Sequence, residues 1–418
     1  MMTLDTCTPD LQQLQTLESA LDNIFQTLVP IQETECIELK FGLGRILART
    51  LTSPVNLPYE RNSAMDGYAF CSEDLEIKRD NRLVQIGTSW AGRPYIGRLK
   101  AGECVRIMTG AILPENADSV VIQEQVLQHG SEIEFPSNIR PHQNIREAGE
   151  DLKQGNMLLS AGQKLNAADI ALLAAVGLEE IEVIRPIKIA YCSTGDELTP
   201  LGQPLTTGKI YDSNRYLLGA LLQNPCYQTT DLGILRDDPN LLEQTLLSAA
   251  SENDAIISTG GVSVGDADHI KTVLEQHGQI NFWKIAMKPG KPLAFGKLGS
   301  NYFFGLPGNP VAVATTFNKI VIPALNHLCG IVPANPLRIQ AMSLSRLKKS
   351  SGRLEFQRGI LSSTPEGTFK VKSAGLQGSH ALRSLSQANC YIILDAACSG
   401  IEIGATVTVE PFSSMMAP

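Results

Sequence analysis

Apolar positions divide the chain into stretches with different periods. Residues from about 10 to 30 carry apolar side chains at helical spacing, and residues from about 36 to 51 follow the same pattern. From about 65 to 135 short β-like runs alternate with Gly and Pro turns, which predicts a β-rich region. Helical spacing returns after Asn166, a candidate N-cap, and ends near Gly177, a candidate C-cap. The helical stretches therefore flank a β-rich insertion and predict one split helical domain.

Strands and helices alternate in the next part of the chain, which predicts an α/β domain with a parallel sheet. We expect strands at 187–192, 229–235, 255–258, 280–285, 293–295 and 302–305. We expect helices at 213–222, 239–250, 267–277 and 310–328. Ligands of such sheets bind at the carboxyl ends of the strands. After Pro333 and Pro336 the pattern is β again, and this last segment is locally basic.

Four domains are therefore expected. They are a split helical domain (8–58 and 152–185), an inserted β-rich domain (59–151), an α/β domain (186–332) and a C-terminal β domain (333–418).

Charge and cysteine content exclude several classes of function. The 418 residues carry a net charge of -8, which argues against a broad basic surface for nucleic acid. The nine cysteines form no C-x-x-C pair and most lie in apolar runs, so we expect reduced thiols in a cytoplasmic protein rather than disulfides. No apolar stretch approaches the length of a membrane span.

A glycine-rich segment, 258–268, follows the predicted strand 255–258 and precedes a predicted helix. Unpaired N–H groups at such a turn and the positive end of the helix dipole attract phosphate. Glycines let the backbone approach an anion, hydroxyls add donors, and carboxylates at the same turn suit a divalent cation bridging to phosphate. The residues concerned are Thr259, Gly260, Gly261, Ser263, Gly265, Asp266 and Asp268. The segment predicts binding of a phosphorylated small molecule, with a metal.

Other strand ends carry related chemistry. Ser193-Thr194-Gly195 repeats the Ser-Thr-Gly pattern and leads to Glu197, so two such turns on adjacent strands would face one crevice; an ordinary N-cap turn is the alternative. Asp237 closes a third strand and is a candidate metal or ligand contact, whereas Asp238 suits a helix cap. The stiff Lys-Pro-Gly-Lys-Pro segment follows Lys284, and strand parity would place Lys284 and Lys288 on one side, where both could neutralise an oxyanion. Pro307, Gly308 and Asn309 form a turn before a helix, which is explained by capping alone or by a bound anion.

Taken in order, these motifs resemble those of the molybdopterin molybdenumtransferase family. The resemblance covers nearly the whole chain. It is carried by 62–69, 106–111, 149–151, 193–198, 260–266, 288–292, 306–310, 355–359 and 378–380. A single glycine-rich turn would be weak support, whereas this ordered set is specific.

The resemblance implies a multidomain α/β fold with a C-terminal β-barrel. It implies a homodimer whose active site lies between the α/β domain of one subunit and the inserted domain of the other. The implied reaction is hydrolysis of adenylylated molybdopterin with insertion of molybdate into its dithiolene, supported by Mg²⁺ and releasing AMP. A molybdopterin adenylyltransferase is the implied partner that delivers the substrate.

The resemblance also implies roles for individual residues. The loop Thr259–Gly265, the turn 306–309, Ser193 and Thr109 would hold the pterin phosphate or adenylate. Glu197, Asp237 and Asp268 would bind Mg²⁺ or polarise water, and Lys284 and Lys288 would stabilise charge on phosphate or hold molybdate. Asp66 and Asp151 would complete the catalytic set from the inserted domain, and Arg358 and Ser379 would contact an oxyanion.

Three alternatives remain at this point. The related adenylyltransferase shares only the α/β domain, and its turn is closer to Thr-Gly-Gly-Thr-Gly than to this sequence. A scaffold protein would be expected to carry a long linker, and the chain has none. A paralogue that binds pterin without turnover is disfavoured by the carboxylates that the chain retains.

Overall fold

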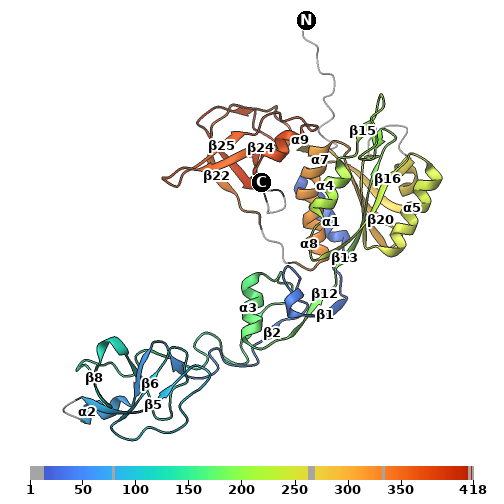
Figure 1. Cartoon of the computed structure of the whole chain (residues 1–418). Coiled ribbons are helices and arrows are strands. Elements are labelled where there is room, and N and C mark those ends of the chain that lie inside the picture. The colour runs from blue at the N-terminus through green and yellow to red at the C-terminus, as the bar shows by residue number, and fades with distance from the viewer. Residues whose placement is uncertain (1–13, 78–80, 262–268, 332–334, 413–415, 417–418) are drawn as a thin grey trace.

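The chain folds into an elongated molecule with four regions (Figure 1). The computed structural model describes residues 14–77, 81–261, 269–331, 335–412 and 416. The α/β domain and the C-terminal domain lie side by side at one end, and the inserted domain lies at the other, beyond a narrow connecting region. Within the described residues, no helix is both long and apolar enough to cross a membrane.

The α/β domain is built on a six-stranded sheet in the order β16-β13-β17-β21-β20-β18. Strands β16, β13, β17 and β21 are parallel, β20 is antiparallel to β21, and β18 is antiparallel to β20. The bounds are β13 (Ile187–Thr194), β16 (Tyr227–Leu235), β17 (Ala255–Thr259), β18 (Gly278–Lys284), β20 (Pro292–Leu298) and β21 (Asn301–Leu306). The expected strands are therefore present, and the parallel part of the sheet has an antiparallel extension.

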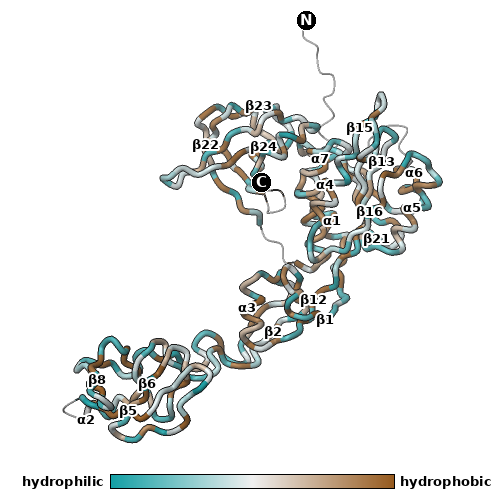
Figure 2. Tube along the Cα trace, viewed as in Figure 1, coloured by the Kyte–Doolittle hydropathy of each residue, from teal (hydrophilic) through white to brown (hydrophobic). Residues whose placement is uncertain are grey.

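Helices cover both faces of this sheet, which explains why its central strands are continuous apolar runs. On one face Ile257 and Phe304 pack against α1, α4, α7 and α8; on the other Ile256 and Phe303 pack against α5 and α6. Helix α1, which the sequence analysis assigned to the split helical domain, therefore packs in the core of the α/β domain. The tube in Figure 2 is correspondingly hydrophobic along these strands. The helix bounds are α1 (Leu17–Thr27), α4 (Asn214–Leu221), α5 (Pro239–Glu252), α6 (His269–His277), α7 (Pro310–Thr316) and α8 (Ile322–Leu328).

One expected helix of the α/β domain is interrupted. The predicted helix 310–328 consists of α7, a π-helical turn η4 (Phe317–Val321) and α8. Within η4 the ammonium of Lys319 is buried, pairs with Glu410 and lies 5.1 Å from the ring centre of Phe356 and 4.9 Å from that of Tyr391. Burial lowers the pKa of Lys319, and the pairing with Glu410 opposes that shift. This contact fastens the C-terminal domain to the α/β domain.

The split domain contains more strands than the apolar spacing predicted. The helix expected over 36–51 is wrong: residues 34–38 form β1 (Thr34–Glu38), which pairs with β12 (Glu180–Ile184), and a short 3₁₀ turn, η2 (Leu39–Phe41), follows. A second pair joins β2 (Leu51–Thr52) and β11 (Met157–Leu159). The expected helix after Asn166 is α3 (Ala167–Ala175), with a capping box between Asn166 and Asp169.

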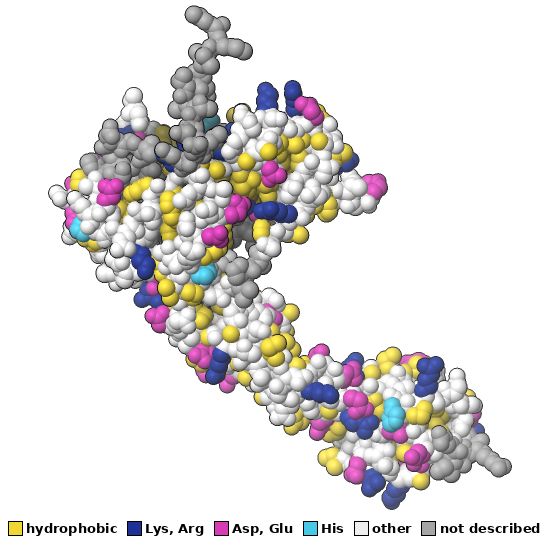
Figure 3. Space-filling view, turned by 180° about the vertical axis from the view of Figure 1, so that it is seen from behind, with side chains coloured by type: hydrophobic (Ala, Val, Ile, Leu, Met, Phe, Trp, Pro, Cys, Tyr) yellow, Lys and Arg dark blue, Asp and Glu magenta, His cyan; other side chains and the backbone are white. Residues whose placement is uncertain are grey.

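The inserted domain is a six-stranded sheet in the order β7-β4-β6-β5-β9-β8. Its bounds are β4 (Gly67–Phe70), α2 (Ser72–Ile77), β5 (Arg82–Ser89), β6 (Glu103–Ile107), β7 (Ser119–Ile122), η3 (Gln123–Gln125), β8 (Leu127–His129) and β9 (Glu132–Glu134). The chain enters and leaves the domain side by side, where Leu57 and Leu152 exchange backbone hydrogen bonds of 2.7 and 3.0 Å. Beyond them β3 (Asn62–Ser63) pairs with β10 (Ile145–Arg146). The space-filling view in Figure 3 shows charges of both signs interspersed over this region.

The C-terminal domain is a closed five-stranded barrel, as expected, because β24 pairs with both β25 and β26. The barrel strands are β22 (Ile339–Ser343), β24 (Leu354–Ser363), β25 (Phe369–Ser373), β26 (Cys390–Leu394) and β28 (Thr406–Pro411). Smaller elements are β23 (Leu347–Lys348), α9 (Leu382–Gln387) and β27 (Gly400–Ile401). The two-residue strand β19 (Met287–Lys288) of the preceding domain pairs with Leu354–Glu355 of β24. The short strand β19 of the α/β domain therefore belongs to the barrel sheet.

Candidate active site

Two glycine-rich turns meet at the carboxyl end of the central sheet, as the sequence predicted. Ser193 at the end of β13 lies in register with Thr259 at the end of β17, and Gly260-Gly261 follows. Gly260 has φ +86°, and a Cβ at this position would lie closer than 3.0 Å to the carbonyl oxygen of Thr194. Only glycine fits such a close approach of two backbones. The turn therefore presents its backbone, rather than side chains, to the space above it.

The turn after β21 completes the same edge of the sheet. The hydroxyl of Thr259 donates to the carbonyl of Pro307 at 3.1 Å, so the second and third turns are bonded directly. Asn309 precedes α7 in an extended conformation, and Pro310 occupies the first helical position. The Asn309 side chain makes no capping hydrogen bond, so capping alone does not explain the residue.

A cavity of about 840 Å³ lies over these turns, between the α/β domain and the barrel. Its walls include nine of the residues that the sequence analysis selected: Glu197, Asp237, Gly260, Gly261, Lys288, Pro307, Gly308, Asn309 and Ser379. Seven segments distant in sequence contribute to it. The volume is in the range of small-molecule sites.

Positive charge lines the cavity from two domains. Lys288 and Lys291 come from the Lys-Pro-Gly-Lys-Pro segment, and Lys348 and Arg353 come from the barrel. The ammonium of Lys288 lies 3.4 Å from a carboxylate oxygen of Glu355, a buried residue of β24. Sequence reasoning noted the basic character of the segment after Pro336 but did not place Lys348 or Arg353 in the site, because the barrel's position over the sheet is a tertiary feature.

Two of the three proposed metal ligands line the cavity. Glu197 follows β13 and Asp237 follows β16, the neighbouring strand, so both carboxylates belong to the same edge of the sheet. Asp268, Ser263 and Gly265 lie outside the described residues. No cluster of three His, Cys, Asp or Glu side chains with metal-binding geometry occurs in the part of the chain that the structure describes. Mg²⁺ binds through one or two carboxylates together with waters and phosphate oxygens, so Glu197 and Asp237 fit that ion in the presence of a phosphorylated ligand.

Three predicted residues of the α/β domain lie behind the cavity wall or away from it. Ser193 and Thr259 are buried beneath the turns, and their hydroxyls hydrogen-bond to protein atoms. Lys284 ends β18 and is not part of the cavity lining, whereas Lys288 lies in it. The parity argument assumed one continuous strand, but the chain leaves β18 at Lys284 and enters the barrel sheet at Met287.

Arg358 is buried in the barrel, with 1% of its surface exposed. Its guanidinium donates to the carbonyls of Leu376 (2.8 Å) and Gly378 (3.0 Å) and to the hydroxyl of Ser384 (3.2 Å). Burial lowers the pKa of Arg358. In this conformation Arg358 holds the loop that carries Ser379 into the cavity.

Asp66, Thr109 and Asp151 lie far from this cavity within one chain. Asp66 accepts hydrogen bonds from the backbone N–H and the hydroxyl of Thr109, at 2.7 and 2.8 Å. These two hydrogen bonds lower the pKa of Asp66, and the backbone hydrogen bond has the larger effect. The Asp66 carboxylate is therefore ionised at neutral pH. Asp151 lies at the exit from the inserted domain. Figure 1 places this domain at the opposite end of the molecule from the barrel.

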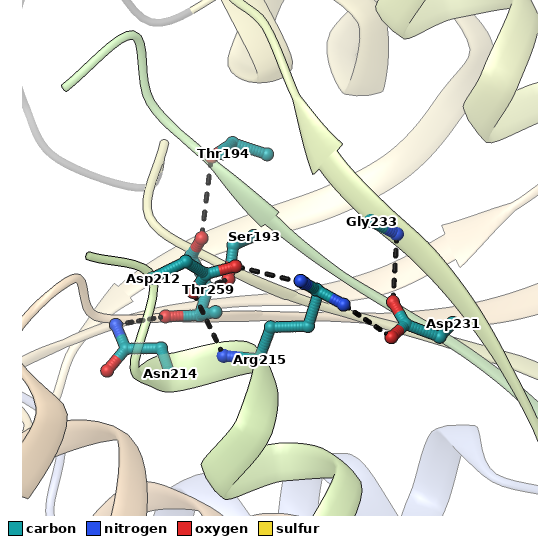
Figure 4. Close-up of polar contacts among 8 residues, drawn as sticks. All are labelled: Ser193, Thr194, Asp212, Asn214, Arg215, Asp231, Gly233 and Thr259. Atoms are coloured by element: carbon teal, nitrogen blue, oxygen red, sulfur yellow. Dashed lines mark hydrogen bonds and ion pairs between the residues drawn. The ribbon is translucent and has the colours of Figure 1, made fainter. Parts of the chain in front are cut away.

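A buried polar network beneath the turns was missed by sequence reasoning (Figure 4). Asp212, which is 1% exposed, accepts from the Ser193 hydroxyl at 2.8 Å and from the Arg215 guanidinium at 3.0 Å. Asn214 donates to the Thr259 hydroxyl at 3.0 Å and to the Gly308 carbonyl at 2.7 Å. The signal was the polar run Asp212-Ser213-Asn214 at the start of the predicted helix 213–222, which capping explains equally well.

These features define a class of protein: multidomain α/β proteins with a cavity, lined by cationic side chains, between the carboxyl edge of a parallel sheet and a β-barrel. Three family models match the chain in succession. They are "MoeA N-terminal region (domain I and II)" over 15–177, "Probable molybdopterin binding domain" over 190–327 and "MoeA C-terminal region (domain IV)" over 340–412.

Similar proteins agree with these matches. The molybdopterin molybdenumtransferase of Haemophilus influenzae is 42% identical over 96% of this chain and 99% of its own length. That of a Nostoc species is 36% identical over 93% of this chain and 92% of its own length. A solved structure of the molybdopterin biosynthesis MoeA protein from Pyrococcus horikoshii OT3 superposes with a TM-score of 0.83 at 27% identity, covering 96% of this chain and all of that one. The chain belongs to the molybdopterin molybdenumtransferase family.

Proposed function

We propose that this protein inserts molybdenum into molybdopterin, hydrolysing adenylylated molybdopterin and releasing AMP as molybdate enters the dithiolene. The observation that carries the proposal is the composition of the 840 Å³ cavity. Glycine-rich turns suited to phosphate line this cavity, together with four cationic side chains that come from two domains. Relatives named molybdopterin molybdenumtransferase, at 42% and 36% identity, support this function over other uses of a phosphate site.

The glycine turns are assigned to the phosphate part of the substrate. Gly260, Gly261 and Gly308 bring backbone close to the cavity without a side chain in between. Backbone N–H groups at such turns stabilise phosphate oxygens without any reorganisation, which is the condition for electrostatic catalysis. Asn309 adds a side-chain amide at the N-terminus of α7.

The lysine-rich wall is assigned to molybdate. Lys288 and Lys291 are held by a stiff Pro-Gly-Lys-Pro segment, and Lys348 and Arg353 of the barrel line the same cavity. A doubly charged oxyanion is bound best where several cations converge in a partly dehydrated site. Ser379, on the loop held by Arg358, offers a hydroxyl in the same cavity.

Glu197 and Asp237 are assigned to Mg²⁺, with Asp268 as a third candidate outside the described residues. A bound Mg²⁺ would neutralise the pyrophosphate and lower the pKa of the attacking water. The two carboxylates would hold the cation at the edge of the sheet where the glycine turns hold the phosphates. Because Asp238 caps α5 next to Asp237, the two neighbouring aspartates have separate tasks.

A homodimer would give the inserted domain a place in the site. Within one chain Asp66 and Thr109 are hydrogen-bonded to each other in the inserted domain, at the end of the elongated molecule that is far from the cavity. Placing the inserted domain of a second subunit over the cavity of the first would bring Asp66, Thr109 and Asp151 to the substrate. The protein would act in the cytoplasm and receive its substrate from a molybdopterin adenylyltransferase.

The first test is turnover by the purified protein. We expect AMP release from adenylylated molybdopterin that requires both Mg²⁺ and molybdate and yields a molybdenum-bearing pterin. Lys288→Ala should lower that rate by at least tenfold, whereas Lys188→Ala, which changes an exposed lysine of β13, should not. AMP release that is independent of molybdate, or formation of adenylylated pterin from ATP, would contradict the proposal.

The second test separates the two neighbouring aspartates. Asp237→Asn should raise the Mg²⁺ concentration needed for half-maximal AMP release by about tenfold or more, because a neutral amide is a weaker ligand for a hard cation. Asp238→Asn is the matched control, since Asn is as good an N-cap as Asp. Equal Mg²⁺ requirements in the two variants would remove Asp237 from the metal site.

The third test addresses the shared site. At an Mg²⁺ concentration below the requirement of Asp237→Asn, this variant and Asp66→Ala should each have little activity alone, but an equimolar mixture that exchanges subunits should recover activity. In such a mixed dimer one site combines the intact cavity of one chain with the intact inserted domain of the other. No recovery, with mixed dimers shown by mass spectrometry, would place both residues in one chain's site or remove Asp66 from it.

A further inference from the structure

The side chain of Asn214 bridges two of the turns that form the floor of the cavity. We propose, building on the proposed function, that Asn214 is a positioning residue that sets the spacing of the Thr259–Gly261 and Pro307–Gly308 turns for the phosphate part of the substrate. It acts through these turns, since Asn214 itself is not part of the cavity lining. Its removal should weaken substrate binding more than it slows the reaction of bound substrate.

The contacts of the Asn214 amide support this role. One nitrogen donates to the Thr259 hydroxyl at 3.0 Å and to the Gly308 carbonyl at 2.7 Å (Figure 4 shows the first). Thr259 passes the connection on, because its hydroxyl donates to the Pro307 carbonyl at 3.1 Å. A single side chain from a third segment therefore holds the ends of β17 and β21 together where the ligand-facing backbone begins.

The first turn of α4 is itself anchored from below. Asp212, two residues before Asn214, accepts from the backbone N–H of Arg215 at 3.2 Å and from its guanidinium at 3.0 Å. The same guanidinium reaches Asp231 of β16 at 2.5 Å, and Asp231 in turn accepts from the N–H of Gly233 at 2.8 Å. Burial lowers the pKa of Arg215, but its hydrogen bonds to the two aspartates outweigh burial and raise it. The start of α4 is therefore locked to the sheet by charged groups, which fixes the position of Asn214.

The acceptor end of the same amide argues against a purely structural role. The Oδ1 atom of Asn214 is buried and has no hydrogen-bond partner among the residues that the structure describes. A buried acceptor without a partner is unfavourable for stability. A small apolar residue would avoid that cost, so an amide at this position is explained by what its nitrogen does for the two turns.

The consequence for binding follows from which contacts remain without Asn214. Thr259 keeps its bond to Pro307, so the turns do not separate, but the Gly308 carbonyl loses its donor. The spacing of the two turns then varies, and the ligand has to order them when it binds. Part of the binding free energy is spent on that ordering.

The test uses Asn214→Ala and Asn214→Asp in the full-length protein. Asn214→Asp preserves volume and removes both amide donor hydrogens. Asn240→Ala is the matched control, because Asn240 is an exposed asparagine in the first turn of α5. The probes are AMP, titrated by calorimetry with Mg²⁺ present, and adenylylated molybdopterin in the turnover assay.

We expect both Asn214 variants to raise the Kd for AMP and the KM for the pterin by about 30-fold, the effect of losing two ordinary hydrogen bonds. The value of kcat should fall less than threefold. In a Thr259→Val background, which lacks one of the two acceptors, Asn214→Ala should have a smaller effect. Asn240→Ala should match the wild type in all three parameters.

Three results would overturn the inference. They are an unchanged Kd and KM in both Asn214 variants, a loss confined to kcat, or a loss of folded α/β domain in Asn214→Asp as well as in Asn214→Ala. Failure of the proposed function is seen separately, in the wild type. A wild-type protein that binds AMP but does not convert the pterin refutes the proposed reaction and leaves the binding comparison valid. A wild-type protein that binds neither probe refutes both.

Discussion

Replacing Gly260 by alanine tests whether close backbone approach creates the phosphate-facing turn. The new Cβ would lie closer than 3.0 Å to the Thr194 carbonyl oxygen and 3.1 Å from the Thr194 hydroxyl oxygen. The nearest of these is backbone, so no side-chain rotation relieves the clash. The ends of β13 and β17 would have to move apart, and with them the two glycine-rich turns.

The expected loss of stability in Gly260→Ala has two parts, and alanine substitutions at other glycines of this chain measure them separately. Holding alanine at φ +86° costs about 1–2 kcal/mol, and forcing the two strand ends apart adds about 1–3 kcal/mol, as overpacking does. Gly233 has φ +79° and no atom within 4 Å of the position that an alanine methyl group would take, so Gly233→Ala carries only the first part. Gly308 is not at positive φ and meets only the Gly260 Cα at 4.0 Å, so Gly308→Ala should be nearly neutral for stability.

Tryptophan fluorescence during urea unfolding is a suitable assay. The chain has two tryptophans, and Trp283 packs against Phe295 in the α/β domain at 5.7 Å between ring centres. In a Trp90→Phe background the signal comes from this domain alone. We expect a loss of about 2–5 kcal/mol for Gly260→Ala, about 1–2 kcal/mol for Gly233→Ala and less than about 0.5 kcal/mol for Gly308→Ala.

The reasoning would be refuted by equal losses for Gly260→Ala and Gly233→Ala, because the backbone clash would then contribute nothing. AMP binding supplies a second check. If Gly260→Ala retains wild-type affinity for AMP, close approach of the two strand ends is not what forms the phosphate site.

The remaining predictions concern stability and thiol chemistry. Lys319→Ala should destabilise the contact between barrel and α/β domain by about 3–5 kcal/mol, because it leaves the buried Glu410 with only the exposed Arg338 guanidinium, 3.8 Å away. Arg346→Ala, from an exposed pair, should cost about 0–1 kcal/mol, and urea unfolding of the two variants checks this. Iodoacetamide at about pH 8 should modify exposed Cys36 in the native protein but not Cys104, whose pKa burial raises to about 12; modification of both at one rate, by peptide mass spectrometry, would contradict the structure. Because the folded pKa of Cys104 lies above the ordinary 9.0, stability due to its thiol is present below about pH 9 and is lost as the pH rises toward 12, so wild type should lose more stability than Cys104→Ala across that window.

The α/β domain was the most predictable part of the fold, for a physical reason. Its strands are buried on both faces, so continuous apolar runs such as Ala255–Ile257 mark them without ambiguity. The split domain was harder because its strands are short and half exposed. Residues 36–51 have apolar side chains at helical spacing, yet Cys36 pairs with Glu182, a partner far along the chain that no local pattern reveals. The π-helical turn at Phe317–Val321 gave no recognisable signal either.

The candidate site was predictable where strand order determines it. Parallel strands end at one edge, so the turns after β13, β17 and β21 had to meet, and they do. Contributions from outside the sheet were not predictable in this way. Lys348 and Arg353 reach the cavity because the barrel lies over it, and Asn214 looked like part of an ordinary helix start.

The paired crossing at Leu57 and Leu152 has a consequence for how the chain folds. The β1–β12 ladder joins segments that the whole inserted domain separates in sequence, so forming it first would require closing a long, flexible loop. If the inserted domain folds first, it brings Leu57 and Leu152 together, and the loop that the β1–β12 ladder has to close shrinks from residues 39–179 to the two segments 39–56 and 153–179. A destabilised inserted domain would then slow assembly of the split domain, although every contact within the split domain is unchanged. Refolding rates would show this kinetic defect, whereas the contacts of the folded protein do not reveal it.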